Sequence, residues 1–427
     1  MEELSNCLNQ IVLIHGMVYK IREMSGFAFV ILRTKYDLLQ CLYSSEYADF
    51  SLSDIKVNMS IVFKGMVVRE ERSRLGLEIR LIGCEILSSA AEEIPIVINN
   101  KSVIASLETL LDYRPITLRN EKERAIFKIQ EGICKGFRDF LHRNKFTEIH
   151  SPKIVFGSAE GGANIYKLDY FGKEAYLTQS PQFYKQIMVG VYERVYEIAP
   201  VFRAEKHDTS RHINEYTSVD LEIGFIKDFY DIMQLETKMI LETLIYLKEQ
   251  YHNDLDRLNV DIPVFSEIPA ISFLEAKDML TKQYDFKTSD YEDFEPEEEK
   301  LICDIFKKQT GCDFVFVTHY KSSKRPFYTM DSQQYPGLTD SFDLLFRGME
   351  ITTGGQRIHN YSDQIAKMNR LGMNPDQFDS YLMAHKYGLP PHGGLGLGLE
   401  RFTAKLLGFQ NVRYATMFPR DINRLKP

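Results

Sequence analysis

The sequence predicts an α+β protein in which a small N-terminal β-barrel precedes a larger domain built on an antiparallel sheet flanked by helices. Three features of the 427 residues support this prediction. Residues 1–88 consist of short runs rich in Val, Ile, Phe and Tyr. Long helical patterns begin only after Arg114 and Pro115. Beyond that point strand-like runs outnumber helices and often follow one another directly, which favours antiparallel pairing.

The N-terminal domain, residues 1–88, is expected to contain five strands, over 11–21, 26–33, 38–43, 60–69 and 75–87. Five strands separated by polar turns are typical of a Greek-key barrel of the OB type. Such barrels often bind single-stranded nucleic acid by stacking bases on exposed aromatic side chains. Phe27 and Phe29 share one face of the second strand. Their rings either fill the barrel core or form a stacking surface, and the pattern leaves both readings open.

The rest of the chain divides into a hinge, residues 89–112, and a larger domain, residues 113–427. A short helix is expected over 102–111, and a long amphipathic helix over 121–144 leads into an extended segment, 146–152. Further strands are expected over 175–178, 194–200, 217–225, 342–346 and 349–353, and further helices over 180–189, 228–249 and 363–371. A helical insertion is expected over about 265–320. Its charged part, 273–309, is expected to be solvated and is assigned no chemistry.

Composition and charge exclude several classes of protein. A hydrophobic fraction of 44% is typical of a globular chain. With a net charge of -8, a nucleic acid partner would need a local basic face. No apolar run approaches the roughly 20 residues needed to cross a bilayer, and the first ten residues lack a signal peptide pattern, so a soluble, cytoplasmic protein without a membrane partner is expected. The six cysteines form no CxxC pair, which argues against a zinc site and a disulfide framework.

Two stretches of the larger domain concentrate groups that bind phosphates and metal ions. FRAEKHDTSRHINEY, residues 202–216, places Arg203, Arg211 and His212 between two apolar strands, where cations can converge on one polyanion. FDLLFRGMEITTGGQRIH, residues 342–359, supplies oxygen ligands that suit Mg²⁺ carried in with phosphates.

A third stretch, PPHGGLGLGLER, residues 390–401, has four glycines within six positions and ends in Arg401. So much bare backbone suggests that a nucleotide approaches the main chain closely. Because the sequence contains neither GxxxxGK[ST] nor a strand-GxGxxG-helix unit, the three stretches together predict an ATP site without a Walker loop.

The order of FTEIHSP (146–152), FRAE...RHINEYTSVDLEIGF (202–225) and GLGLGLER (394–401) resembles motifs 1, 2 and 3 of class II aminoacyl-tRNA synthetases. With GSAEGGA (157–163), SPQFYKQ (180–186) and GMEITTGGQRIH (348–359), essentially the whole chain is similar to aspartyl-tRNA synthetases of the archaeal and eukaryotic-like type. The resemblance implies a homodimer with Pro152 at the contact. It also implies ATP, L-aspartate, Mg²⁺ and tRNA(Asp) as partners, and leaves open whether tRNA(Asn) is a second acceptor.

For ATP, the resemblance implies that Arg203 contacts the α-phosphate, that Glu205 lies near the adenine, and that Arg401 sandwiches the adenine. Arg211 and His212 match the loop that reaches the γ-phosphate. The implied nucleotide-binding set is Arg203, Ala204, Glu205, Arg211, His212, Ile213, Glu350, Gly398, Leu399, Glu400 and Arg401. The implied catalytic residues are Arg203, Glu350 and Arg401. The implied Mg²⁺ ligands are Glu350, Thr353 (where relatives carry Ser) and Asp343.

For the amino acid, the resemblance implies that Glu160 and Gln182 contact the ammonium group and that Lys185 and Arg357 face the side-chain carboxylate. The implied set is Glu160, Gln182, Phe183, Tyr184, Lys185, Arg203, Thr353 and Arg357. In the barrel, Phe27, Gln40 and Glu78 match positions that bind anticodon bases. Asparaginyl enzymes tend to lack the lysine at position 185, so Lys185 favours aspartate. Three alternatives remain open: an asparaginyl-tRNA synthetase, an amidoligase paralogue without tRNA function, and a non-catalytic OB-type RNA-binding or regulatory protein.

Overall fold

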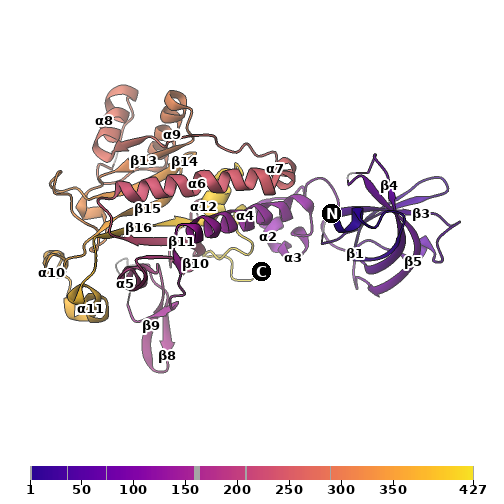
Figure 1. Ribbon diagram of the computed structural model, residues 1–427, viewed down its shortest axis with the longest axis horizontal. Helices are drawn as coiled ribbons and strands as arrows, with labels where there is room; N and C mark the ends of the chain where they lie inside the picture. Colours follow the sequence, from indigo (N-terminus) through magenta and orange to yellow (C-terminus); the bar gives the residue numbers. More distant parts are fainter. Residues whose placement is uncertain are drawn as a thin grey trace. The chain divides into compact units, whose positions relative to one another are not determined.

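The computed structural model describes residues 2–35, 37–73, 75–157, 164–206, 209–288 and 290–426. Contacts divide the chain into two compact units, Met1–Ala105 and Ser106–Pro427. Figure 1 shows a barrel in the first unit and a large sheet with helices in the second. The boundary falls inside the range expected to be a hinge, and the last residues of that range already form helix α2 (Leu107–Asp112) of the second unit.

The first unit is a closed barrel with the strand order β1-β2-β3-β5-β4. The strands are β1 (Ile11–Glu23), β2 (Ala28–Arg33), β3 (Leu38–Tyr43), β4 (Ser60–Arg69) and β5 (Leu77–Ser88), with a short helix α1 (Glu2–Ser5) and a 3-10 turn η1 (Leu52–Asp54). Val30, Leu32 and Cys41 alternate with outward-facing residues and are fully buried inside the barrel, as the two-residue period of a strand requires. The predicted OB-type barrel is confirmed.

The second unit is built on an eight-stranded sheet with the order β12-β13-β14-β15-β16-β11-β10-β6. Neighbouring strands are antiparallel except for the pairs β12–β13 and β10–β6. The strands are β6 (Thr147–Glu148), β10 (Arg194–Phe202), β11 (Glu215–Gly224), β12 (Ala270–Ser272), β13 (Phe314–Thr318), β14 (Ser341–Phe346), β15 (Glu350–Arg357) and β16 (His392–Gly398). A small second sheet contains β7 (Ile154–Val155), β8 (Lys167–Tyr170) and β9 (Lys173–Leu177). The predicted antiparallel sheet flanked by helices is confirmed.

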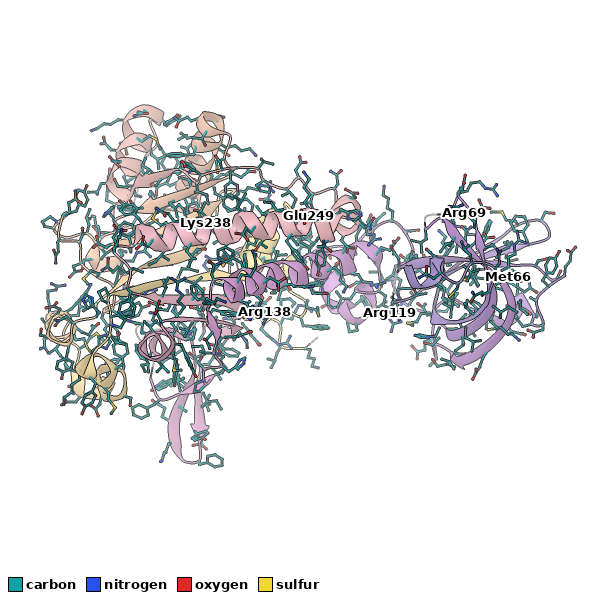
Figure 2. All side chains as sticks on the ribbon, viewed as in Figure 1. Met66, Arg69, Arg119, Arg138, Lys238 and Glu249 are labelled. Carbon is teal, nitrogen blue, oxygen red and sulfur yellow. The ribbon has the colours of Figure 1, made fainter. Side chains whose placement is uncertain are left out.

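Two long helices, α4 (Glu121–Arg143) and α6 (Tyr230–Gln250), lie side by side over one face of this sheet (Figure 1). Helix α4 begins where the Asn120 side chain accepts a hydrogen bond from a first-turn amide. Gly136 lets the helices approach closely, because a Cβ there would lie 2.8 Å from Thr243. Figure 2 labels Lys238 and Glu249, exposed polar side chains of α6, while the apolar sides of both helices join the main core.

The second unit contains further helices, of which α12 joins the main core beside α4. They are α3 (Arg114–Thr117), α5 (Gln182–Tyr192), α7 (His252–Leu258), α8 (Phe273–Tyr284), α9 (Pro296–Thr310), α10 (Tyr361–Arg370), α11 (Asp379–Tyr387) and α12 (Leu399–Leu406), with 3-10 turns η2 (Ser322–Lys324), η3 (Pro375–Phe378) and η4 (Val412–Ala415). Among the helices that the structure describes, no helix has the length and apolar character needed to span a bilayer.

The charged stretch 273–309 is less solvated than its composition suggested. It forms α8 and α9, and Phe273, Leu280 and Ile302 are fully buried in a cluster with Val315 and Val317 of β13. These apolar residues recur at helical spacing and therefore share one face, which packs on the sheet. Three charged residues of the two helices, Lys277, Glu298 and Glu299, are buried as well. The expectation of a solvated insertion was wrong for that face.

Candidate active site

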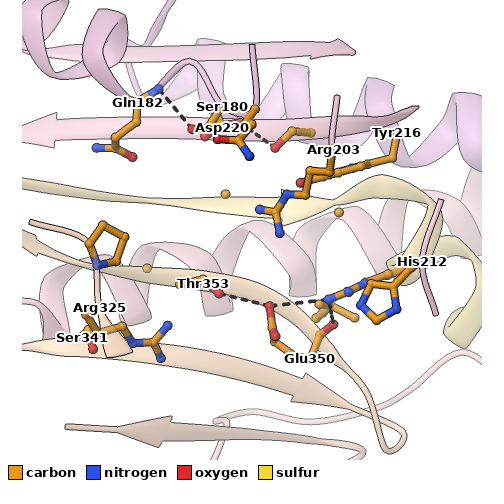
Figure 3. Close-up of a pocket in the computed structure, with 18 of the residues that line it drawn as sticks. Ser180, Gln182, Arg203, His212, Tyr216, Asp220, Arg325, Ser341, Glu350 and Thr353 are labelled. Carbon is orange, nitrogen blue, oxygen red and sulfur yellow. Dashed lines mark hydrogen bonds and ion pairs between the residues drawn. The ribbon is translucent and has the colours of Figure 1, made fainter. Parts of the chain in front are cut away.

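A cavity of about 530 Å³ opens on the face of the eight-stranded sheet opposite the α4–α6 core. Strand β11 shows how the sequence produces the two faces. Val219 and Leu221 belong to the core, whereas Ser218 and Asp220 line the cavity, because alternate residues of a strand point to opposite sides. Figure 3 shows side chains from α5, the strands and the loop around Arg325 converging on this cavity.

One end of the cavity gathers cationic side chains. Arg203 follows β10, and its guanidinium carbon lies 5.7 Å from the centre of the Tyr216 ring. Arg401, in the first turn of α12, donates from Nη1 to the Glu350 carbonyl oxygen at 3.1 Å. Burial, and then the positive charge of Arg401, lowers the pKa of His212, which keeps that ring neutral at pH 7. Such an arrangement is suited to a polyanion such as a triphosphate.

A further cation of this end, Arg211, already has a carboxylate partner. Its Nη2 donates to Glu299 Oε2 of α9. The same oxygen accepts from the Glu350 backbone N–H at 3.0 Å. An anion that binds Arg211 therefore competes with Glu299. The helical range that the sequence analysis left without chemistry thus reaches an arginine of the cavity wall.

Oxygen atoms suited to Mg²⁺ lie at the same end. Thr353 Oγ1 donates to Glu350 Oε1 at 3.1 Å, and both residues line the cavity. Burial would raise the pKa of Glu350, but Arg401 and Arg325 outweigh it and hold the pKa below its usual range, so the carboxylate stays charged. One carboxylate beside one hydroxyl fits a Mg²⁺ ion that takes its other ligands from phosphates and water. Within the described ranges no group of three or more His, Cys, Asp or Glu could hold a metal ion by itself.

The third predicted Mg²⁺ ligand, Asp343, is not brought to the cavity. It lies opposite Thr353 on the neighbouring strand β14, but it is absent from the cavity lining. Its Oδ2 accepts from Arg325 Nη2 at 2.8 Å. Burial raises the pKa of Asp343 to about 6 although Arg325 opposes the rise. The carboxylate holds Arg325, and its role as a third Mg²⁺ ligand stays a prediction.

The other end of the cavity holds two buried cations between two buried carboxylates. Lys185 Nζ lies 2.8 Å from Asp220 Oδ1 and 3.4 Å from Glu222 Oε2. Arg357 Nε donates to Glu222 Oε1 at 2.9 Å. Burial acts to raise the pKa of Glu222, but Arg357 and Lys185 together hold it below its usual range. The four charges balance one another, so this end can receive a ligand that carries both an ammonium group and a carboxylate.

Glycines of β16 make room for these carboxylates. A Cβ at Gly394 would collide with Glu222 Oε2 and the Leu221 carbonyl oxygen, and one at Gly396 would lie 3.2 Å from Asp220 Oδ1. The glycine-rich stretch was expected to let a nucleotide approach the main chain closely. The structure adds a second reason at Gly394, namely the close approach of a buried carboxylate, while Gly396 and Gly398 line the cavity itself.

The structure brings most of the predicted ATP and amino acid positions to this one cavity. The predicted residues that line it are Gln182, Lys185, Arg203, Glu205, Arg211, His212, Ile213, Glu350, Thr353, Arg357, Gly398, Glu400 and Arg401. Four others, besides Asp343, do not line it: Ala204, Phe183, Tyr184 and Leu399. The rings of Phe183 and Tyr381 pack 4.6 Å apart in a separate apolar cluster, and Leu399 belongs to the main core. Glu160 lies outside the described residues.

Sequence reasoning missed three charged residues of the site. Asp220 and Glu222 stand two apart within the strand TSVDLEIG, so they share the face that Ser218 also occupies. Paired acids in an otherwise apolar strand were the available signal. Arg325 gave no such signal, because it follows a 3-10 turn far from the motifs and is placed by Asp343.

In the barrel, the three predicted anticodon positions differ in exposure: Phe27 is exposed, Gln40 is half-buried and Glu78 is buried. Phe27, just before β2, is 40% exposed, and its ring packs edge-on against Phe29 at 5.4 Å. The buried residues of β2 are Ala28, Val30 and Leu32, so the alternative that Phe27 fills the core is excluded by its position. Gln40 Nε2 donates to Glu78 Oε2 at 2.8 Å across β3 and β5. Phe27 thus supplies an exposed aromatic ring, and Gln40 supplies an amide that is held in place by its hydrogen bond to Glu78.

Comparison with known proteins agrees with this geometry. Residues 106–422 match the family model described as tRNA synthetases class II (D, K and N). The chain is 44% identical over 413 residues to an aspartate–tRNA(Asp/Asn) ligase of Thermus thermophilus, covering 96% of both chains. It is 39% identical to an aspartate–tRNA(Asp) ligase of Picrophilus torridus, again over 96% of both.

Solved structures show the same fold over the whole chain. Asparaginyl-tRNA synthetase from Pyrococcus horikoshii, crystallised with asparaginyl-adenylate, superposes with a TM-score of 0.91 at 30% identity, covering 99% of this chain and 97% of the other. The extent of these matches establishes the family. The chain belongs to the class II tRNA synthetases of the D, K and N group.

Proposed function

We propose that the protein activates L-aspartate with ATP and transfers it to tRNA(Asp). The observation that carries the proposal is the division of one cavity into two ends. Arg203, Arg401 and Glu350 stand at the polyanion end, and Lys185 and Arg357 stand buried at the other. We place a carboxylate side chain at the second end, because Lys185 and Arg357 can exchange part of their pairing with Glu222 for it, whereas a neutral amide offers them no negative charge.

In the first step, the α-carboxylate of aspartate attacks the α-phosphorus of ATP, and pyrophosphate leaves. Arg203 would stabilise the negative charge that develops on the α-phosphate. Arg211 and the neutral His212 would hold the terminal phosphates, and Arg401 would cover the adenine. Glu350 and Thr353, together with the phosphates, would hold a Mg²⁺ ion, which would supply positive charge next to the leaving group. The protein supplies no nucleophile, so its contribution is positioning and electrostatics.

In the second step, a ribose hydroxyl at the tRNA terminus attacks the carbonyl carbon of aspartyl-adenylate, and AMP leaves. The amino acid stays bound throughout because its side chain remains at Lys185 and Arg357. These cations give up part of their pairing with Glu222, whose Oε2 is 3.4 Å from Lys185 Nζ, to receive the substrate carboxylate. Asp220 remains beside Lys185 and keeps it oriented.

Pyrophosphate exchange into ATP tests the proposal, with L-aspartate and L-asparagine supplied separately. Exchange with aspartate is expected. Exchange with asparagine alone would make the protein an asparaginyl enzyme. Exchange with aspartate but no charging of any tRNA would favour the amidoligase alternative. A non-catalytic RNA-binding protein predicts no exchange with either, and no effect of Arg203→Ala on any activity.

We propose that the barrel reads the anticodon through Phe27, Gln40 and Glu78. The exposed Phe27 ring offers a stacking surface. Charging of purified tRNA(Asp) and tRNA(Asn), assayed side by side, decides whether tRNA(Asn) is a second acceptor. The name of the Thermus thermophilus relative gives specific reason to include it.

We also propose a cytoplasmic homodimer whose contact includes the segment 146–152 and Pro152. Ile154 and Phe156, which follow this segment, are 48% and 84% exposed, as expected for side chains that a second subunit would cover. Sedimentation equilibrium tests the dimer. A mass of one chain at micromolar concentration would reject it.

A further inference from the structure

A row of buried polar side chains connects β16 to the amino acid end of the cavity. His392, Gln186, Gln182 and Tyr381 are each no more than 3% exposed. His392 Nδ1 lies 2.8 Å from the Pro390 carbonyl oxygen, and His392 Nε2 lies 2.9 Å from Gln186 Nε2. Gln186 Oε1 accepts from Gln182 Nε2 at 3.0 Å and from the Tyr381 hydroxyl at 3.3 Å. Gln182 lines the cavity, so the row ends at the ligand.

The direction of these hydrogen bonds is fixed from the Pro390 end. A carbonyl oxygen can only accept, so His392 Nδ1 must carry a proton. Burial lowers the pKa of His392 to about 4, so the ring is neutral and its Nε2 is an acceptor. Gln186 must therefore turn its NH₂ group toward His392 and its oxygen toward Gln182.

The orientation of Gln186 in turn determines the orientation of the Gln182 amide. Because the Gln186 oxygen faces it, Gln182 must donate through its own NH₂ group, and its carbonyl oxygen is the end left for the cavity. Figure 3 shows the Gln182 side chain extending from α5 beside Ser180 and Asp220. An oxygen in this place attracts an ammonium group, whereas a reversed amide would present two N–H donors to it.

We propose that His392, acting through Gln186, is a positioning residue that turns the Gln182 oxygen toward the ammonium group of the substrate amino acid. The inference rests on the proposed activation of aspartate. It concerns one group of the substrate and leaves the binding of ATP and of the two substrate carboxylates unaffected. If His392 merely supported the pocket, its loss would weaken the binding of all these groups, whereas a role in orienting Gln182 affects only the ammonium group.

The experiment compares His392→Leu with His392→Gln in the full-length protein. Leucine removes the acceptor for Gln186, so Gln186 and then Gln182 can take either amide orientation. Glutamine restores an acceptor oxygen near the position of Nε2. The measurements, by pyrophosphate exchange, are the KM for aspartate, the KM for ATP and the inhibition constant of succinate, which is aspartate without its ammonium group.

For His392→Leu, we expect the KM for aspartate to rise roughly tenfold or more, as for loss of one hydrogen bond to a charged group. The KM for ATP and the inhibition constant of succinate should change less than about twofold on the same reasoning, and His392→Gln should recover most of the affinity for aspartate. Gln186→Met, which keeps the length without the amide, should reproduce the effect if the leucine variant does not fold. Tyr381→Phe is the matched control, since it removes a donor to Gln186 without reversing any bond.

An equal weakening of aspartate and succinate would overturn the inference, because it would indicate a loosened pocket. An unchanged KM for aspartate in both the leucine and methionine variants would also overturn it. The proposed function fails in a different way, by an absence of aspartate-dependent exchange in the wild-type protein.

Discussion

The ion pair between Arg211 and Glu299 gives a prediction in which removing a charge improves substrate binding. Arg211 is proposed to bind the terminal phosphates of ATP, yet its guanidinium already donates to the Glu299 carboxylate. ATP must therefore displace or share this partner. Glu299→Gln keeps an oxygen that can accept from the Glu350 N–H, which lies 3.0 Å from Glu299 Oε2. Burial raises the pKa of Glu299 to about 7, so the substitution removes a competing charge when the assay is run at about pH 8.

The size of the effect follows from the strengths of the two kinds of hydrogen bond. A bond to a charged group contributes about 1.5–3 kcal/mol, and a neutral bond contributes about 0.5–1.5 kcal/mol. The substitution thus weakens the competitor by about 1 kcal/mol, which corresponds to a factor of about five in binding. We expect the KM for ATP to fall by about this factor, with little change in the KM for aspartate.

The assay is pyrophosphate exchange as a function of ATP concentration at saturating aspartate. Glu297→Gln is the matched control, because it removes the same charge from an exposed position in the same turn of α9. In the background of Arg211→Ala, the benefit of Glu299→Gln should disappear, which is the signature of coupling between the two side chains. A KM for ATP that is unchanged or higher than in the Glu297→Gln control would refute the reasoning.

Three further predictions concern stability, metal dependence and RNA binding. Burial raises the pKa of Glu236 from its ordinary value of 4.5 to about 8. Between these two pH values the native state holds a proton that the unfolded state has released. The stability of the protein therefore falls as the pH rises from about 4.5 to about 8. The unfolding free energy of Glu236→Gln minus that of the wild type, measured by denaturant titration, should therefore be about 2 kcal/mol larger at pH 8 than at pH 6. The same difference at both pH values would contradict this prediction. Thr353→Val should raise the Mg²⁺ concentration for half-maximal exchange by roughly tenfold, whereas Thr353→Ser should leave it near the wild-type value, and equal behaviour of the two would remove Thr353 from the metal site. Phe27→Ala should raise the KM for tRNA by roughly fivefold or more without altering pyrophosphate exchange, and a parallel loss of exchange would point to misfolding instead of lost stacking.

The architecture could be read from the sequence because its signals are local. Strand β3 and strand β4 occur at the residues expected, 38–43 and 60–69, since alternating apolar residues bounded by turns depend on near neighbours alone. Helix α4, Glu121–Arg143, likewise differs by only one residue from the expected range of 121–144. The motifs around Arg203, Glu350 and Arg401 also indicated a shared nucleotide site, and their side chains do line one cavity.

What remained undetermined was how charges from distant segments pair. Arg211 contacts Glu299, which is 88 positions away, and Arg325, which follows the 3-10 turn η2, is held by Asp343 of strand β14. The chain order carries no sign that a residue in a charged insertion will approach a loop of the second motif. For the same reason, nothing in the sequence indicated that Asp343 pairs with an arginine.

By itself, the sequence determined the two-part organisation, the strand and helix pattern and the residue types of an ATP site, because periodicity and turn chemistry act over a few positions. Tertiary structure decided which of those residues face the same cavity and in which direction their hydrogen bonds run. The order Pro390, His392, Gln186, Gln182 joins two segments about 200 residues apart. Its direction exists only because folding places a backbone carbonyl, which can only accept, at one end of the row.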